Sequence, residues 1–203
     1  HSGQVCVSVQ RVFVPRAELP DFAAELAEGA EALTVGDPTK AETQCGPLIR
    51  PAEVDRVASW VDAAVQGGAR LAAGGKRMGS TLYQPTVLVD PPCDADVSRK
   101  EVFGPVVCIY GYDDVDAAIG QANALPYAFQ AAVFSDRMSW ADYCVETLAA
   151  SAVMVNDHTA FRVDWMPFAG RRQSGLGTGG IGYTMVDMSE EKMVVVNAPS
   201  SVR

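Results

Sequence analysis

The sequence predicts an α/β fold in three layers, with a mainly parallel β-sheet flanked by helices. Short apolar runs of strand length, such as residues 86–89 and 106–110, alternate along the chain with amphipathic segments of helical period. Runs that no polar residue interrupts are typical of strands covered on both faces. Apolar residues make up 48% of the 203 residues and charged residues 20%, a composition that predicts a substantial core.

The first half of the chain is expected to contain three strands and two helices. Residues 10–14 form a β-branched and aromatic run that Pro15 ends, which predicts a strand. Apolar residues then recur at helical spacing from Leu19 to Leu33, before a Gly-Asp-Pro turn at 36–38. A second helix starts at Pro51 and ends at the glycine pair 67–68. The other two strands are expected at 86–89 and 106–110.

The second half continues the alternation and then breaks it. Asp113 is the expected N-cap of a third helix, and a fourth helix begins near residues 135–136. Strands are expected at 131–134 and 152–155. A glycine-rich stretch at 167–182 precedes a last helix, which an isolated strand at 193–196 follows. Since no repeat or linker divides the chain, we expect one domain over 1–203, in which 189–203 carry a C-terminal strand available for subunit contact.

The charge balance and the cysteines argue against several classes of partner and site. A net charge of −9 repels phosphate backbones and anionic lipids, and no apolar stretch approaches the length of a membrane span, so neither nucleic acid nor membrane is an expected partner. The five cysteines form no CxxC pair and only two histidines are present, so we expect neither a disulfide framework nor a metal site. Reduced thiols predict a cytoplasmic protein. The absence of an initial Met predicts a fragment of a longer chain.

Cys6 is the first candidate for chemistry. It follows Gly3 closely and is expected at the entry to a short helix. Unpaired N–H groups at a helix N-terminus stabilise a thiolate and could also stabilise the oxyanion formed when the thiolate attacks a carbonyl. The spacing alone leaves open that Cys6 is an inert thiol, because free cysteines are usually packing residues. Cys45 and Cys93, in loops, are its expected competitors for an alkylating reagent.

Two further segments place aromatic and polar residues in loops. Glu101 and Phe103 precede a Gly-Pro turn, where the carboxylate could bind ribose hydroxyls and the ring could pack on a flat ligand; the alternative is an ordinary turn with a solvated Glu and a buried Phe. His158, Phe161 and Phe168 lie on the long loop after the strand at 152–155, and open α/β sheets build their sites in such loops. By itself, His158 is more typical of a surface histidine than of a catalytic base.

Taken in order, these segments resemble the aldehyde dehydrogenase superfamily along nearly the whole chain. The matching segments are Gly-Gln-Val-Cys at 3–6 with the strand at 10–14, Gly-Asp-Pro at 36–38, Gly-Pro-Leu-Ile at 46–49, Pro-Thr-Val-Leu at 85–88, Glu-Val-Phe-Gly-Pro at 101–105, Ala-Ala-Val-Phe at 131–134, the loop at 167–175, and Glu-Glu-Lys at 190–192. Each is weak alone, but their shared order identifies the chain with the catalytic domain of that family and favours Cys6 as a nucleophile.

The resemblance implies a role for each candidate residue. Cys6 would attack an aldehyde to form a thiohemiacetal, which becomes a thioester when hydride passes to NAD or NADP, and water would then release a carboxylic acid. Glu101 would contact the nicotinamide ribose, and Phe103 would pack beside the same group. The residues that would line the substrate pocket are Val5, Val7, His158, Phe161 and Phe168.

The resemblance also implies what this chain lacks. In the family, the general base, the oxyanion-hole asparagine and the cofactor-binding domain precede the nucleophile, so the chain alone is expected to be inactive. The parent enzyme would act on a small aldehyde as a homodimer or homotetramer, and residues 156–168 resemble the lactaldehyde and semialdehyde branch. Two alternatives remain open: a dehydrogenase that passes the acyl group to coenzyme A, and a non-catalytic assembly module with the same fold.

Overall fold

The computed structural model of the chain describes residues 1–197 and has a four-stranded sheet at its centre. The sheet contains β1 (Arg11–Pro15), β2 (Arg70–Ala73), β3 (Thr86–Val89) and β4 (Val106–Tyr112), in the order β1-β4-β3-β2. β4 is parallel to β1 and β3, while β2 is antiparallel to β3. The strands predicted in the first half are confirmed to within two residues, whereas β2 and the short helix α3 (Asp96–Arg99) were not predicted.

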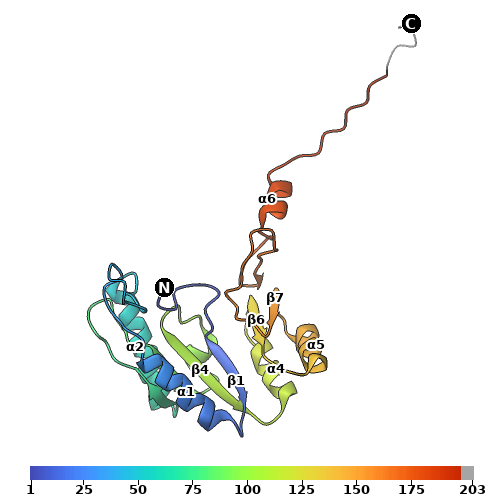
Figure 1. The fold of residues 1–203 in the computed structure, drawn as a ribbon. Helices are drawn as coiled ribbons and strands as arrows, with labels where there is room; N and C mark the ends of the chain where they lie inside the picture. The colour runs from blue at the N-terminus through green and yellow to red at the C-terminus, as the bar shows by residue number, and fades with distance from the viewer. Residues whose placement is uncertain (198–203) are drawn as a thin grey trace.

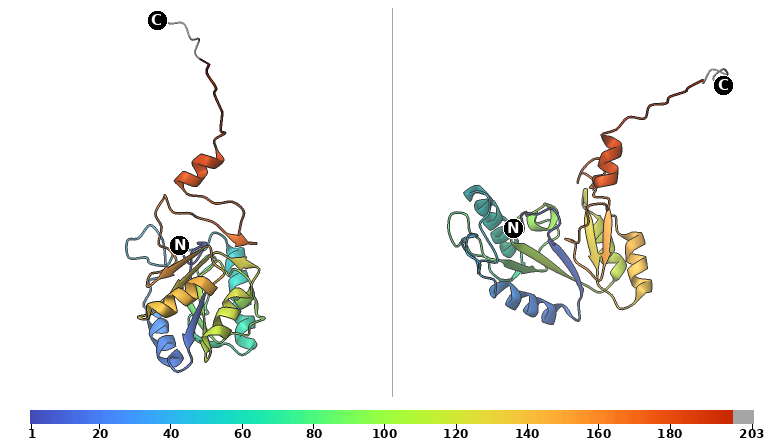
Figure 2. Two further views of the ribbon diagram at one scale, coloured as in Figure 1. Left: turned by 90° about the vertical axis from the view of Figure 1, so that its right-hand side faces the viewer. Right: turned by 45° about the horizontal axis from the view of Figure 1, so that its top comes forward.

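Helices α1 (Leu19–Glu31) and α2 (Pro51–Gln66) cover opposite faces of this sheet (Figure 2). The alternation of side chains along the strands explains the arrangement. Val87 and Ile109 pack in a cluster with α1, whereas Leu88 and Cys108 face the other way and pack in a cluster with α2. All residues of β3 are buried, as its uninterrupted apolar run predicts. The three-layer α/β prediction is therefore confirmed.

The second half of the chain adds two two-stranded sheets, of which the pair β6 and β7 is labelled in Figure 1. β6 (Gln130–Val133) pairs in parallel with β7 (Ala152–Val155), with α4 (Val115–Asn123) and α5 (Met138–Thr147) beside them. β5 (Tyr127–Ala128) pairs with β8 (Arg171–Arg172) in antiparallel fashion. The sequence predicted one sheet; instead, no ladder of hydrogen bonds joins β6 to β1 among the described residues.

Side-chain hydrogen bonds to helix ends connect the two halves. The Arg11 guanidinium on β1 donates to the carbonyl oxygens of Gln121 (3.3 Å) and Ala122 (3.1 Å) near the end of α4, where exposed carbonyls favour a cation. At the other end of α4 the expected cap was one residue off. The carboxylate of Asp114 accepts from the amide of residue 116 at 3.1 Å, whereas Asp113 binds Arg16.

The C-terminal segment extends away from all three sheets (Figures 1 and 2). No residue of α6 (Ile181–Asp187) is buried, and the side chains of residues 193–196 are 72 to 86% exposed. Residues 193–196 form no strand in the single chain, because a strand needs a hydrogen-bonded neighbour and no described segment supplies one. Pairing with another chain stays a prediction, and residues 198–203 of the expected contact segment lie outside the described residues.

Burial separates the cysteines into two groups. All five are free thiols; Cys45, Cys108 and Cys144 are buried, while Cys6 and Cys93 are exposed. The expectation that Cys45 is accessible is therefore wrong, since it is only 5% exposed although it lies in a loop. None of the helices within residues 1–197 is both long and apolar enough to cross a membrane.

Candidate active site

Cys6 lies on an exposed turn just ahead of β1. The amide of Ser8 donates to the carbonyl of Val5 at 3.0 Å, which closes a single turn around Cys6. The expected helix entry is wrong, because the chain passes from this turn directly into β1, whose pairing with β4 begins at Arg11. Stabilisation of a thiolate by a helix N-terminus therefore does not apply here. The turn instead leaves the thiol open to solvent.

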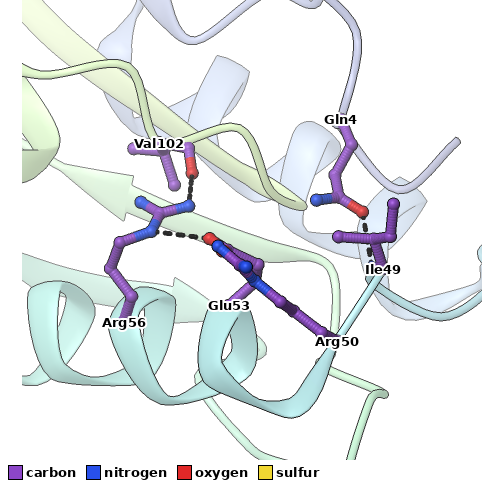
Figure 3. Close-up of polar contacts among 6 residues, drawn as sticks. All are labelled: Gln4, Ile49, Arg50, Glu53, Arg56 and Val102. Atoms are coloured by element: carbon purple, nitrogen blue, oxygen red, sulfur yellow. Dashed lines mark hydrogen bonds and ion pairs between the residues drawn. The ribbon is translucent and has the colours of Figure 1, made fainter.

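The Cys6 turn, residues 1–8, is held against two other segments. Gly3 has a φ of +72°, and a Cβ atom built on it would lie 2.0 Å from the carbonyl oxygen of Gly104. Only glycine allows both this backbone conformation and this close approach. The Gln4 side chain accepts a hydrogen bond from the amide of Ile49 at 2.9 Å (Figure 3). These contacts place the turn directly beside the loop that carries Glu101 and Phe103.

Glu101 and Phe103 occupy an irregular segment that leads into β4. Glu101 is exposed, and its carboxylate has no hydrogen-bond partner among residues 1–197. Phe103 is 37% exposed and has a φ of +47°, a left-handed conformation that side chains rarely adopt. The exposed Glu101 agrees with the alternative of an ordinary turn, whereas the exposed Phe103 ring departs from it. The positive φ of Phe103 and the free carboxylate of Glu101, next to the Cys6 turn, make this loop a candidate ligand-binding loop.

The loop after β7 contacts the Cys6 turn through Thr159. The Thr159 hydroxyl donates to the carbonyl of Val7, and the residue is only 7% exposed. The base of the loop is fixed by Asn156, whose amide binds the backbone N–H and carbonyl of Ser135 at 2.8 and 2.9 Å. His158 points outward, with 68% of its side chain exposed. Sequence reasoning missed Thr159, because a hydroxyl residue within an exposed loop gives no signal that it is buried.

The aromatic candidates of this loop are divided between solvent and a separate cluster. Phe161 is 47% exposed. Phe168 packs edge-on against Phe129, with ring centroids 5.1 Å apart, and the Arg162 guanidinium lies 4.6 Å from the centre of the Phe168 ring. The structure thus joins Val7 to the loop of His158 by a hydrogen bond, whereas Phe168 belongs to a neighbouring aromatic cluster.

The open groove along α6 is not part of this arrangement. It has a volume of about 540 Å³, and Arg162, Asp164 and residues of α6 line it, but Cys6 does not. Among residues 1–197, no group of three or more His, Cys, Asp or Glu side chains is placed to hold a metal ion. The groups of the candidate site that could take part in a reaction are therefore the Cys6 thiol, the Glu101 carboxylate and the aromatic rings.

Comparison with known proteins gives a single family. A sequence model described as the aldehyde dehydrogenase family matches residues 1–194. The chain is 41% identical over 197 residues to 3-sulfolactaldehyde dehydrogenase of Priestia aryabhattai, an alignment that covers 97% of this chain and 41% of that protein. It is 35% identical to lactaldehyde dehydrogenase of Methanococcus aeolicus, over 97% of this chain and 42% of the relative.

Solved structures agree with the sequence relatives. The fold is similar to aldehyde dehydrogenase 21 of Physcomitrella patens in complex with its reaction product succinate, with a TM-score of 0.91 and 32% identity over 99% of this chain and 42% of that one. It is also similar to the glyceraldehyde-3-phosphate dehydrogenase GapN of Methanocaldococcus jannaschii in complex with NADP, with a TM-score of 0.88 and 34% identity over 93% and 41% of the two chains. The chain thus spans about two fifths of the length of these relatives.

Proposed function

The chain belongs to the aldehyde dehydrogenase family, and from this premise we propose that it supplies the nucleophile of an NAD(P)-dependent enzyme that oxidises an aldehyde to a carboxylic acid. One observation carries the proposal. An exposed cysteine sits on a turn that glycine holds in backbone contact with the loop of Glu101 and Phe103. A nucleophile and a cofactor-binding loop must be adjacent in such an enzyme, because the atom that Cys6 attacks is also the atom that is oxidised.

Each step of the reaction follows from the chemistry of the thiolate. The Cys6 sulfur bonds to the aldehyde carbon while the carbonyl electrons move to oxygen, which gives a thiohemiacetal. Collapse of that oxyanion expels a hydride and leaves a thioester on Cys6. When bound, NAD(P) supplies the hydride acceptor. Water then attacks the thioester, the C–S bond breaks, and the carboxylic acid and the thiol are released.

The loop of Glu101 and Phe103 fits one end of a dinucleotide. The Glu101 carboxylate is an acceptor without a partner among the described residues, which suits a pair of ribose hydroxyls. The exposed Phe103 ring offers a flat apolar surface for the nicotinamide. Solved relatives bind either NADP or NAD, so both forms of the cofactor stay within the proposal.

We propose a short aldehyde of the lactaldehyde or semialdehyde type as substrate, with Val5, Val7, His158, Phe161 and Phe168 lining its pocket. The position of Arg162 favours a substrate with an anionic substituent. Its guanidinium stacks on the Phe168 ring and forms no ion pair with a carboxylate among residues 1–197. Several relatives are named for, or were solved with, a molecule that carries a sulfonate, a carboxylate or a phosphate group. A panel of lactaldehyde, succinic semialdehyde and a neutral alkyl aldehyde tests this class, and Arg162→Met should raise KM only for the charged member.

We further propose a cytoplasmic enzyme that works as a homodimer or homotetramer, and that this chain does not turn over by itself. It aligns with about two fifths of the length of its relatives, and the family resemblance assigns the cofactor-binding domain and the general base to the portion that this chain does not span. Placing the nicotinamide can be worth about 7–11 kcal/mol of barrier, and general-base assistance about 10²–10⁴-fold in rate.

The test compares NADH or NADPH formation by this chain and by the chain joined to the preceding portion of the Priestia 3-sulfolactaldehyde dehydrogenase. We expect turnover only in the joined protein and its loss on Cys6→Ser. Turnover by the short chain that depends on Cys6 would refute the proposal that it lacks a cofactor site. Inactivity of the joined protein would favour a non-catalytic assembly module, and acyl-CoA formation in the presence of coenzyme A would favour the acylating alternative.

A further inference from the structure

The side chain of Gln10 binds three backbone groups that flank Glu101. Its Nε2 donates to the carbonyl oxygens of Val97 (2.9 Å) and Lys100 (2.7 Å), and its Oε1 accepts from the amide of Val102 at 2.8 Å. Gln10 lies between the Cys6 turn and β1, which begins at the next residue. A single amide therefore ties the segment that carries Cys6 to both sides of the segment that carries Glu101.

Val102, between Glu101 and Phe103, is held entirely by side chains from other elements. Its amide donates to Gln10, and its carbonyl accepts from the Arg56 Nη2 at 2.7 Å (Figure 3). Its own side chain is 1% exposed. An irregular segment normally has few such restraints and moves freely. Here both polar groups of one residue and its side chain are fixed, which explains how the neighbouring Phe103 keeps a φ of +47°.

Arg56 is itself held in place on α2. Its Nε binds the carboxylate of Glu53 at 2.9 Å, and the other oxygen of that carboxylate accepts from Arg50 at 2.8 Å (Figure 3). Hydrogen bonds, the stronger from Arg50 and the weaker from Arg56, lower the pKa of Glu53, so this carboxylate stays charged in the neutral range. The guanidinium also lies 4.6 Å from the centre of the Trp60 ring. The support beneath Val102 is therefore rigid, whereas Gln10 approaches from the side of the nucleophile.

We propose that Gln10 is a positioning residue that sets the distance and orientation of Glu101 and Phe103 relative to Cys6. This inference rests on the proposed function, since it assigns the two loop residues to the cofactor. Two of the three bonds need an N–H donor and one needs an acceptor, so only a side-chain amide of this length satisfies all three. A purely structural Gln10 would add stability without affecting one ligand more than another.

The kinetic test uses the whole enzyme with the substitutions Gln10→Met and Gln10→Glu. Met keeps the length and loses every hydrogen bond, while Glu keeps the acceptor for Val102 but turns a charge toward two carbonyl oxygens. We expect KM for NAD(P) to rise about 10-fold in Gln10→Met and further in Gln10→Glu, with KM for the aldehyde unchanged. Gln44→Met is the control, because Gln44 also binds a backbone amide, that of Thr34 at 3.0 Å, but its side chain makes no hydrogen bond to residues 97–104 among the described residues. It should leave both KM values unchanged.

A second measurement does not depend on activity. Hydrogen exchange on the 203-residue chain should accelerate at residues 101–104 in Gln10→Met, with exchange in β3 and α2 unchanged. Equal rises in both KM values, or exchange that accelerates throughout the chain, would overturn the positioning role. If the whole enzyme bound no NAD(P), the proposed function would fail, while the exchange pattern would still decide whether Gln10 fixes the loop.

Discussion

Replacing Gly3 by alanine should damage the contact between the Cys6 turn and the loop of Glu101 and Phe103. The new Cβ would lie 2.0 Å from the Gly104 carbonyl oxygen, whereas real Cβ contacts are essentially never closer than 3.0 Å, so the two backbones must separate by about an ångström. Holding alanine at a φ of +72° costs about 1–2 kcal/mol, and overpacking of this kind costs about 1–3 kcal/mol. The free energy of unfolding should therefore fall by about 2–5 kcal/mol.

Two assays check this value. Urea unfolding of the chain gives the stability change directly, and a misplacement of about 1 Å between nucleophile and cofactor should lower kcat of the whole enzyme about 10²-fold. Gly29→Ala is the control, because Gly29 lies within α1 with nothing within 4 Å of the added atom, and it should stabilise by about 0.5–1 kcal/mol. A Gly3→Ala protein that unfolds within about 0.5 kcal/mol of wild type would refute the inferred backbone contact.

Four further outcomes are expected. Brief iodoacetamide treatment should label Cys6 and Cys93 before the buried cysteines, as peptide mapping will show; early labelling of Cys108 would contradict the packing of β4. Burial raises the pKa of Cys108 to about 12 in the folded chain, whereas an ordinary thiol has a pKa of about 8.5. Between these two values the Cys108 thiol ionises only in the unfolded chain. The free energy of unfolding should therefore fall with rising pH by about 1.4 kcal/mol per unit. Urea titrations between about pH 8.5 and 10 should show a shallower decline in Cys108→Ala. Thr159→Val should cost about 1–2 kcal/mol and speed hydrogen exchange in residues 157–163, whereas Thr159→Ser should not. Truncation after Lys192 should weaken self-association in light scattering, and unchanged association would remove the C-terminal segment from the subunit contact.

Local patterns were sufficient to predict the longer elements whose partners lie within the chain, but not β2 or the short strands β5 and β8. The apolar run at 86–89 is a buried central strand, and Pro51 begins α2 where a proline suits a first turn. Residues 193–196 have a similar apolar composition but form no strand among the described residues. The difference lies in the hydrogen-bonding neighbour, which the sequence of a segment does not specify.

The candidate site divides in the same way. Cys6, Glu101 and Phe103 could be found because each stands in a short motif whose residue types suggest a chemistry. Gln10 and Thr159 could not, because their importance arises from backbone acceptors and donors 92 and 152 residues away. The helix expected at Cys6 failed for a related reason, since pairing of β1 with β4 begins too soon after the cysteine for a helix to form.

The exposed C-terminal segment has a consequence for handling the protein. Met193 and the three valines after it form an uncharged, β-prone run that is open to solvent, and stacked copies of such a run can grow into cross-β aggregates. Glu190, Glu191 and Lys192 stand directly before it and act as gatekeepers, because stacking in register would bring like charges together. A variant with Glu190→Gln and Glu191→Gln should therefore form thioflavin-positive deposits faster than the unchanged chain.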